Sequence, residues 1–538
     1  MDQMLSKIAR LNEIGIALSA ASDVEVLFEK ILNGAMELTD ADGGSLYRLD
    51  EDDQSLQFVI VTTHSLDIHM GGSSGHEIRF PAIPLYISDG QPNKSNVVSS
   101  AVHDQKTINI PDVYHAEGFD FSGTRKFDQA TGYRTQSILT VPLKNHHGHI
   151  IGVLQLINAQ DEHGKTHEFS TADQQLAESL ASQAAVAMTN NKLIDEQREL
   201  FESFIKLMAS AIDEKSPYTG GHCKRVPELT MMIAEACHNA SEGPLKDFQM
   251  TEKDRYELTI AGWLHDCGKV TTPEYVVDKA TKLETIYDRI NTVDTRFEVI
   301  KRDAEIDALK QKLERLQADP ASDCADIDKA LQEKLAQYED DKEFIRQSNV
   351  GGEFMDEEHQ QRVRDIGNYR WVNAYGVDSK FFDDNEVENL TIPKGTLTPA
   401  EREVINNHMA VTIKMLDQLP FPKHLENVPE YAGGHHERMD GKGYPKGLTR
   451  EQMSLQARMM GIADIFEALS ASDRPYKTGK PLTECLRILG FMKKDNHVDP
   501  DIFDVFVKDR VYQRYAEAFL PKSQIDDVDH AEIPGYEG

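Results

Sequence analysis

The chain has 538 residues, a length that favours about three domains. Asp and Glu total 91 against 58 Lys and Arg, which gives a formal net charge of −33. This acid excess argues against a protein that holds nucleic-acid polymers or anionic membranes by a broad basic surface. It leaves open a small anionic ligand bound at a local site.

Nothing in the sequence indicates export or membrane insertion. The N-terminal stretch lacks an apolar segment followed by a small-residue cleavage site, and no stretch reaches the ~18 apolar residues of a membrane span. The five cysteines are odd in number and scattered, as in a reduced protein rather than a disulfide framework. We therefore expect a cytoplasmic location and no membrane partner.

The first 190 residues change from helical to strand periodicity and back. Apolar residues three and four apart predict helices over 2–20 and 22–40. Short β-branched or apolar segments then predict strands over 44–50, 55–63, 106–110, 136–143 and 149–157. Residues 1–190 are therefore expected to form an α+β domain, an antiparallel sheet with flanking helices.

A long helix follows this domain. Residues 173–213 contain neither Pro nor Gly and keep an apolar seam over more than roughly ten helical turns. A helix of this length needs a partner. We expect residues 175–213 to be a signalling helix that pairs with its copy in a parallel homodimer; the alternative is a long helix packed on its own domains.

Residues 203–283 and 396–520 are helical in pattern and predict one all-α domain, interrupted by residues 284–395. In the interruption, apolar residues follow a 4-3-4-3-4 heptad spacing: Ile286, Ile290, Val293, Phe297, Ile300 and Ala304. After a break at 319–323 a second apolar seam follows, which predicts an inserted helical hairpin. Residues 521–538 are acidic and are expected to be disordered.

Histidines and aspartates gather in a few short segments of the helical part. The candidate metal ligands are His222, His265, Asp266, His408, His435, His436 and Asp464. Imidazole and carboxylate suit iron, manganese, zinc, cobalt or nickel better than magnesium or calcium. Seven ligands exceed the needs of one ion, so the pattern favours two ions that share a carboxylate. Lys269 lies four residues after His265, on the same helical face, where its charge would meet a bound phosphate.

These segments resemble those of a known enzyme family. The sequences HDCGK (265–269), HHERMDGKGYP (435–445), ADIFEAL (463–469) and DRPYK (473–477) resemble the HD-GYP phosphodiesterases, a branch of the HD metallohydrolases. The resemblance covers about 203–283 and 396–515 and implies an all-α bundle that hydrolyses cyclic di-GMP to linear pGpG, to GMP, or to both. Hydrolysis of 3′,3′-cyclic GMP-AMP, hydrolysis of mononucleotides or alarmones, and a catalytically silent cyclic-dinucleotide receptor are the alternatives.

Carried over position by position, the resemblance implies that all seven His and Asp residues bind metal, with Asp266 as the bridging carboxylate. It implies catalytic roles for His265, Asp266 and Lys269, and substrate contacts from Lys269, Gly443, Tyr444, Pro445, Arg474 and Lys477. Some members hold a third metal with a Glu at the position of Tyr218, so we expect two divalent ions here. Iron or manganese is expected, and nickel, cobalt, zinc or magnesium are alternatives.

Three further residues near these motifs carry expectations. Glu467 stands where the family commonly has Asp, and we expect it to lie away from the ligands. Cys223 and Cys267 adjoin predicted ligands, but the His and Asp set is complete without them. We expect both cysteines to be small buried residues rather than thiolate ligands.

The N-terminal domain resembles the GAF sensor modules of cyclic-nucleotide phosphodiesterases. The resemblance lies in 127–143, 148–160 and 169–173. In those GAF domains an Asn is followed by Lys or Arg, whereas Asn158 here is followed by Ala159, which argues against cyclic-nucleotide binding. The domain is expected to bind an unknown small ligand or to serve as a dimerisation module.

Overall fold

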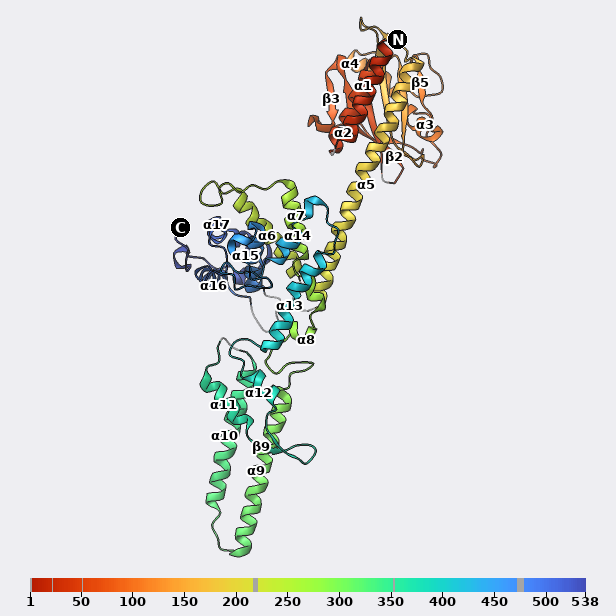
Figure 1. The fold of residues 1–538 in the computed structure, drawn as a ribbon. Coiled ribbons are helices and arrows are strands. Elements are labelled where there is room, and N and C mark those ends of the chain that lie inside the picture. The colour runs from red at the N-terminus through yellow and green to blue at the C-terminus, as the bar shows by residue number, and fades with distance from the viewer. Residues whose placement is uncertain (1, 22, 51, 216–220, 352–353, 472–478) are drawn as a thin grey trace. The chain divides into compact units, whose positions relative to one another are not determined.

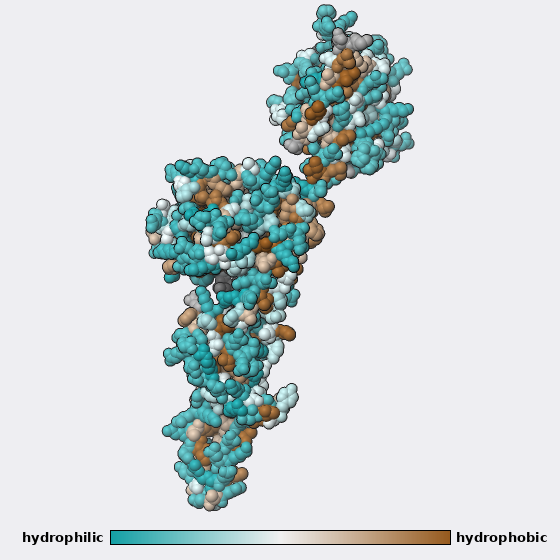
Figure 2. All heavy atoms as spheres, in the orientation of Figure 1, coloured by the Kyte–Doolittle hydropathy of each residue, from teal (hydrophilic) through white to brown (hydrophobic). Residues whose placement is uncertain are grey.

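The computed structural model of the protein describes residues 2–21, 23–50, 52–215, 221–351, 354–471 and 479–538. The chain folds into two units, Met1–Phe201 and Glu202–Gly538 (Figure 1). On the visible face of each unit hydrophilic residues predominate, in keeping with the many acidic side chains (Figure 2). Within the described ranges no helix combines the length and apolar character needed to cross a bilayer.

The first unit is an antiparallel sheet flanked by helices, which confirms the predicted fold class. Its strand order is β3-β2-β1-β7-β6-β5, with β4 beside β2 and β8 beside β7. The strands are β1 (Ala41–Leu49), β2 (Ser55–Thr63), β3 (Ile68–Gly71), β4 (Ile83–Pro84), β5 (Ile108–Ile110), β6 (Ile138–Lys144), β7 (Ile150–Gln160) and β8 (Thr166–His167). The helices are α1 (Asp2–Ser19), α2 (Val24–Thr39), α3 (Val97–Asp104), α4 (Ser122–Thr131) and the first part of α5 (Thr171–Lys215).

The core of this unit lies between the sheet and helices α1, α2 and α5. Ile31 of α2, Leu154 of β7 and Leu180 of α5 are fully buried in it. Gly44 lets α2 approach β1 closely, because a Cβ at this position would lie 2.8 Å from the side chain of Leu32. The alternating and apolar strand patterns of the sequence thus face one core.

Asn158 has a structural role in the first unit. It adopts φ 55°, and its side-chain oxygen accepts a hydrogen bond of 2.7 Å from the Gln136 amide. Its side-chain nitrogen donates to the Tyr133 hydroxyl and to the Arg134 carbonyl, at 2.8 and 2.9 Å. The side chain is therefore occupied in holding the segment before β6.

Helix α5 runs without interruption for 45 residues, from Thr171 to Lys215. Leu176 and Leu180 are buried in the first unit, and Ile205 and Ala209 are buried in the second. One continuous helix therefore contributes to the cores of both units.

The second unit is almost entirely helical. The helices of its main body are α6 (His222–His238), α7 (Glu252–Leu264), α8 (Glu274–Val277), α13 (Pro399–Leu416), α14 (Val428–Gly433), α15 (Leu455–Ser470), α16 (Leu482–Lys494), α17 (Pro500–Lys508) and α18 (Val511–Phe519), with the short 3₁₀ helix η3 (Cys267–Thr271). Capping boxes at Thr251 and Thr398 set the first residues of α7 and α13. These caps fix where the chain enters the helices that carry the site.

The insert contains a helical hairpin, as the heptad spacing predicted. Its elements are α9 (Ile290–Ala318), α10 (Ala325–Asn349), α11 (Glu357–Gly367), β9 (Arg370–Val372), β10 (Asp378–Lys380) and α12 (Asp384–Leu390). Phe297 and Ile345 are fully buried in a core of the insert's own. The start of the predicted seam is wrong: Ile286 precedes α9 and is 95% exposed. Glu284 causes this, since its carboxylate accepts from the Ala280 and Thr281 amides and turns the chain there.

Two buried lysines tie the entry of the insert to its exit. The Lys282 ammonium donates to the carbonyls of Leu390 and Ile392, at 3.1 and 2.8 Å. Burial lowers the pKa of Lys282 to about 8. The Lys279 ammonium donates to Asn389 at 2.6 Å and pairs with Glu401 at 2.7 Å. The insert is therefore anchored to α13, the helix that carries His408.

The tail is ordered, contrary to the expectation of disorder from its acidic composition. Ile533 is buried, and a Cβ on Gly490 of α16 would lie 2.2 Å from the Pro534 carbonyl. The Gln524 side chain donates to the carbonyls of Ser470 and Lys480, at 2.8 and 2.9 Å. A few well-placed apolar and amide groups dock this segment in spite of its acidic residues.

Candidate metal centre

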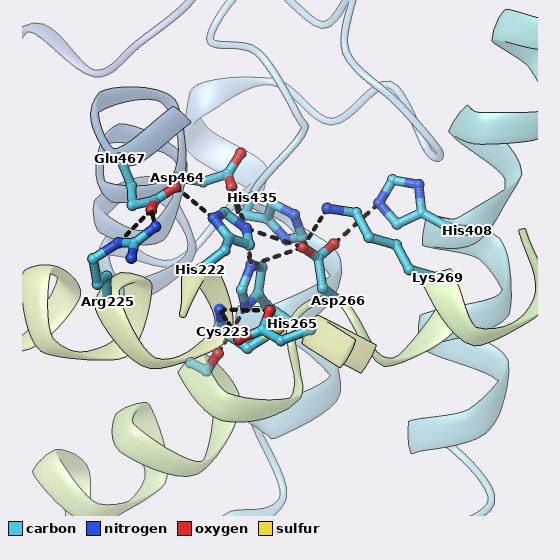
Figure 3. A network of polar contacts seen from close by, with 12 residues as sticks. His222, Cys223, Arg225, His265, Asp266, Lys269, His408, His435, Asp464 and Glu467 are labelled. Carbon is cyan, nitrogen blue, oxygen red and sulfur yellow. Dashed lines mark hydrogen bonds and ion pairs between the residues drawn. The ribbon is translucent and has the colours of Figure 1, made fainter. Parts of the chain in front are cut away.

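Helix ends of the second unit carry most of the predicted ligands. His222 is the first residue of α6, His265 and Asp266 follow the last residue of α7, and His435 and His436 come just after α14. His408 lies inside α13 and Asp464 inside α15. The structure brings all seven residues together (Figure 3 labels six of them).

One group of ligand atoms gathers around one oxygen of Asp266. The Nε2 atoms of His222 and His265 both lie 3.2 Å from Asp266 Oδ2. Asp464 Oδ1 lies 3.4 Å from His222 Nε2. His222, His265 and Asp266 each offer an atom within 4.8 Å of the others, close enough to share one cation.

A second group lies on the other side of Asp266. His408, His435 and His436 also offer atoms that all lie within 4.8 Å of one another. His408 Nε2 lies 3.4 Å from Asp266 Oδ1. The two oxygens of Asp266 thus face different groups, an arrangement suited to a carboxylate that bridges two ions.

Backbone carbonyls orient three of the imidazoles. Nδ1 of His265 lies 2.7 Å from the Gly262 carbonyl, Nδ1 of His435 lies 2.7 Å from the Ala432 carbonyl, and Nδ1 of His408 bonds the Ile405 carbonyl. A carbonyl only accepts, so each Nδ1 must carry a proton, and in the neutral ring Nε2 then keeps its lone pair. These three contacts hold the rings ready for a ligand on the Nε2 side.

Three buried polar atoms at this point have no hydrogen-bond partner among the described residues: Asp266 Oδ1, His408 Nε2 and His435 Nε2. Unsatisfied buried polar atoms are costly and rare in native proteins. A divalent cation would satisfy all three, because each has a lone pair directed into the cluster. The residues present therefore fit a metal.

The electrostatics of the cluster favour charged carboxylates and neutral distal imidazoles. Burial lowers the pKa of His436 to about 4 and holds that of His435 well below its usual value. Burial by itself would raise the pKa of Asp266, but the charge of Lys269 and the hydrogen bond with His222 outweigh it and hold this pKa well below the usual range. Metal ligands need these protonation states.

His222 differs from the other imidazoles because Glu467 faces it. Its Nδ1 lies 2.5 Å from Glu467 Oε2, and Arg225 pairs with the other oxygen of Glu467 at 2.7 Å (Figure 3). Burial alone would lower the pKa of His222, but the charge of Glu467 and the hydrogen bonds with Asp266 and Glu467 outweigh it and raise this pKa to about 10. A carboxylate behind an imidazole in this way orients the ring and increases its basicity.

Glu467 is therefore not distant from the ligands, as the sequence analysis expected. It lies three residues after Asp464 on α15, so the helix presents both side chains to the same neighbour. That spacing was the available signal for Glu467. Arg225, three residues after His222 on α6, carried the same signal.

Lys269 reaches the cluster by a different path from the one predicted. Helix α7 ends at Leu264, and Lys269 lies in η3, so it is not one helical turn beyond His265. Its ammonium nevertheless lies 2.5 Å from Asp266 Oδ2. The charges of Asp266 and Asp464 outweigh the effect of burial and raise the pKa of Lys269. A permanent cation therefore lies beside the cluster.

The loop of Gly443, Tyr444 and Pro445 closes over His436. The Tyr444 ring stacks on His436 with centroids 4.9 Å apart and planes 24° from parallel. The Glu437 carboxylate stabilises the loop by accepting hydrogen bonds from the backbone amides of Lys446 and Leu448, at 2.7 and 2.9 Å. The loop thus lies against the second histidine group.

Other predicted residues are placed less directly. Tyr218, Arg474 and Lys477 lie outside the described residues. Cys223 and Cys267 are buried, and burial raises the pKa of Cys267 to about 11 and that of Cys223 well above its usual value. Both cysteines are therefore thiols near neutral pH, as expected for small buried residues.

Comparison with known proteins supports two domains. A GAF domain family model matches residues 23–188, and an HD domain family model matches residues 384–502. The second range includes His408, His435, His436 and Asp464. The chain thus contains a GAF domain followed by an HD domain.

Several curated proteins are similar to part of the chain. A cyclic di-GMP phosphodiesterase of Thermotoga maritima is 28% identical over 198 residues, 34% of this chain and 53% of that protein. A 3′3′-cGAMP-specific phosphodiesterase of Vibrio cholerae is 38% identical over 126 residues, 23% and 26% of the two chains. A cyclic di-GMP phosphodiesterase of Pseudomonas aeruginosa is 40% identical over 114 residues, 21% and 26%. The chain spans between about a quarter and about a half of the length of these relatives.

Gly268 provides a test of the packing that holds His408. A Cβ at Gly268 would lie 2.0 Å from the His408 carbonyl and 2.6 Å from Thr412. Gly268→Ala must displace α13, and we expect it to cost about 1–3 kcal/mol of stability and to weaken metal binding. The measurements are urea unfolding and manganese titration. Gly123→Ala is the control, because nothing lies within 4 Å of that position; equal effects of the two substitutions would contradict the assignment.

Glu467→Gln tests the carboxylate behind His222. The amide keeps the size of the side chain but loses the charge that orients the imidazole, so we expect metal affinity to fall roughly 10- to 100-fold. Competition with a fluorescent chelator measures this affinity. Glu235→Gln is the matched control, since Glu235 also pairs with an arginine, Arg255 at 2.6 Å, but on a different part of α6. An unchanged affinity in Glu467→Gln would show that Glu467 has no part in metal binding.

Proposed function

We propose that this protein, in which an HD domain follows an N-terminal GAF domain, is a metal-dependent phosphodiesterase that hydrolyses cyclic di-GMP. The observation that supports this most directly is the position of Asp266 between two groups of histidines. The names of the partial relatives, all cyclic-dinucleotide phosphodiesterases, agree with this reading.

Two divalent cations, iron or manganese, would be held by the two groups of ligands. His222, His265 and Asp464 would hold one cation; His408, His435 and His436 would hold the other; and Asp266 would serve both. Such cations supply Lewis acidity and a water that loses its proton near neutral pH. The orphaned atoms of Asp266, His408 and His435 are the observation in favour of this assignment.

Lys269 would bind the phosphodiester. Its ammonium faces the cluster from η3, and its raised pKa keeps it charged at every physiological pH. A fixed cation in a buried site stabilises the negative charge that grows on the phosphoryl oxygens during attack. Lys269 would also let the chain bind a small anion in spite of its net negative charge, because the attraction is local to the site.

Tyr444 would shape the substrate site. Its ring already stacks on His436, which fixes one face of the loop beside the second group of ligands. Aromatic rings stack well on nucleobases, and such a contact would position a guanine against the site. Gly443 has no room for a side chain, because a Cβ there would lie 2.4 Å from the Arg438 amide nitrogen.

Regulation by the GAF domain is the second half of the proposal. GAF domains bind small ligands, but the Asn158 side chain is occupied by the Tyr133 hydroxyl and neighbouring backbone. We therefore propose a ligand other than a cyclic nucleotide. Helix α5 joins the GAF domain to the part of the chain that carries the site.

A homodimer through α5 is also part of the proposal. Large apolar residues of α5 face solvent in the first unit: Leu193 is 52%, Ile194 61% and Leu200 72% exposed. Hydrophobic residues are visible on the stretch of α5 that leaves the first unit (Figure 2). A groove between α1 and α5, lined by Leu18, Gln183 and Val186, would seat the partner helix.

Turnover with defined metals tests the enzyme proposal. The full chain, loaded with Mn²⁺ or Fe²⁺, is incubated with cyclic di-GMP or 3′,3′-cyclic GMP-AMP, and the products are separated by chromatography. We expect cyclic di-GMP to be consumed, and Asp266→Asn to reduce turnover to background because it removes the charge shared by both groups. Binding of the dinucleotide without turnover under any metal would instead favour a silent receptor, and faster turnover of the GMP-AMP substrate would reassign the specificity.

Sedimentation of full-length protein tests the dimer. Ile194→Glu places a charge in the exposed apolar stretch of α5, and we expect it to shift the dimer toward monomer at micromolar concentration. Glu199→Lys is the control, since it changes the charge of the same helix at an exposed polar position. A wild-type chain that sediments as a monomer at every concentration would contradict the proposal.

A further inference from the structure

The last turn of α5 forms hydrogen bonds with the segment that carries Lys269. The ammonium of Lys215, the final residue of α5, donates to the carbonyls of Val270 and Thr272, both at 2.6 Å. It also lies 3.2 Å from the carbonyl of Lys269 itself. These carbonyls belong to η3 and the residue that follows it, so one side chain binds the C-terminal end of this short helix.

The same turn also forms hydrogen bonds with the segment that carries His222. The Asp213 carboxylate accepts from the Gly221 amide at 3.1 Å and from the Cys223 amide at 3.3 Å. Helix α6 begins at His222, and its N-cap residue, Gly221, has no side chain to bond the first amides. Asp213 supplies the missing cap from another helix and places a negative charge at the positive end of α6.

These contacts converge on the metal-ligand cluster. A small cavity is lined by Asp213 and Lys215 on one side and by His222, Asp266 and Lys269 on the other. Asp213 and Lys215 are two residues apart on α5, whereas the segments they hold are separated by most of α6 and all of α7. A displacement of this turn therefore acts on both segments together.

We propose that Asp213 and Lys215 are positioning residues through which α5 sets the geometry of the site. Asp213 fixes His222 through the start of α6, and Lys215 fixes Lys269 through the carbonyls of η3. Because both residues lie in the last turn of α5, a displacement of this turn reaches the two contacts at the same time. The catalytic part of this inference rests on the proposed phosphodiesterase activity; the positioning part does not.

The test compares substitutions of Lys215 in the full chain. Lys215→Met keeps an unbranched side chain that is one atom shorter and removes the charge and the hydrogen-bond donors, whereas Lys215→Arg keeps the charge and the donors. Lys206→Met is the matched control, since Lys206 lies on the same helix and, among the residues that the structure describes, pairs on the surface with Glu202 at 3.7 Å. Circular dichroism and thermal unfolding establish that each variant is folded.

Two readouts are needed, one of which does not depend on turnover. Hydrogen–deuterium exchange, followed by mass spectrometry without substrate, should be faster in peptides covering 266–272 for Lys215→Met and close to wild type for Lys215→Arg and Lys206→Met. With manganese and cyclic di-GMP, kcat of Lys215→Met should fall on the order of 10- to 100-fold, with KM changed much less, because a small misplacement of catalytic groups affects the reaction more than binding.

Asp213→Asn provides the second arm. It should speed exchange at the start of α6, in peptides covering 221–225, and leave 266–272 nearly unchanged. Wild-type exchange in both segments for both variants, or a fall in kcat that Lys215→Arg does not rescue, would overturn the inference. A wild-type chain that does not hydrolyse the dinucleotide would overturn the proposed function alone, because the exchange measurement still decides the positioning role.

Discussion

The second unit depends on one buried charge, the carboxylate of Asp266. This residue is 1% exposed, and a buried carboxylate is costly unless it is paired on every side. His222, His265 and Lys269 face one oxygen, whereas the other oxygen lies 3.4 Å from the Nε2 of His408 and has no hydrogen-bond partner among the described residues. These neighbours come from four separate segments, so α6, α7, η3 and α13 must all be in place before the carboxylate has its full surroundings. The requirement explains why helices from both sides of the insert pack so closely here.

The site is built largely from helix ends, and this choice has a physical reason. A helix end leaves backbone carbonyls without partners, and those of Gly262 and Ala432 bond the Nδ1 atoms of His265 and His435. The same contact that satisfies the carbonyl sets the tautomer and direction of the ring. Gly268 then allows η3 to approach α13 at a distance that no side chain would permit.

Four lysines near this centre and at the base of the insert have defined roles, although the chain as a whole has a net charge of −33. Lys269 faces the cluster, Lys215 holds backbone carbonyls beneath it, and Lys279 and Lys282 anchor the insert. Lys269 pairs with Asp266, and each of the other three lysines lies where several acceptors converge. The acidic residues are spread over the surface and the tail, so the overall charge describes the solvent-facing chain and does not describe the site.

The sequence by itself determined the class of each unit and the type of most helices and strands. It also singled out the seven His and Asp residues that the structure brings together. These features are predictable because hydrophobic periodicity and short motifs are local properties. It did not predict that Glu467 contacts His222, since these residues are 245 positions apart and only packing of α6 on α15 joins them. Lys269 reaches the site because α7 ends at Leu264, Ile286 is exposed because Glu284 turns the chain, and the acidic tail is docked by Gln524 and Ile533. Such outcomes depend on side-chain contacts between distant segments, and these contacts exist only in the tertiary structure.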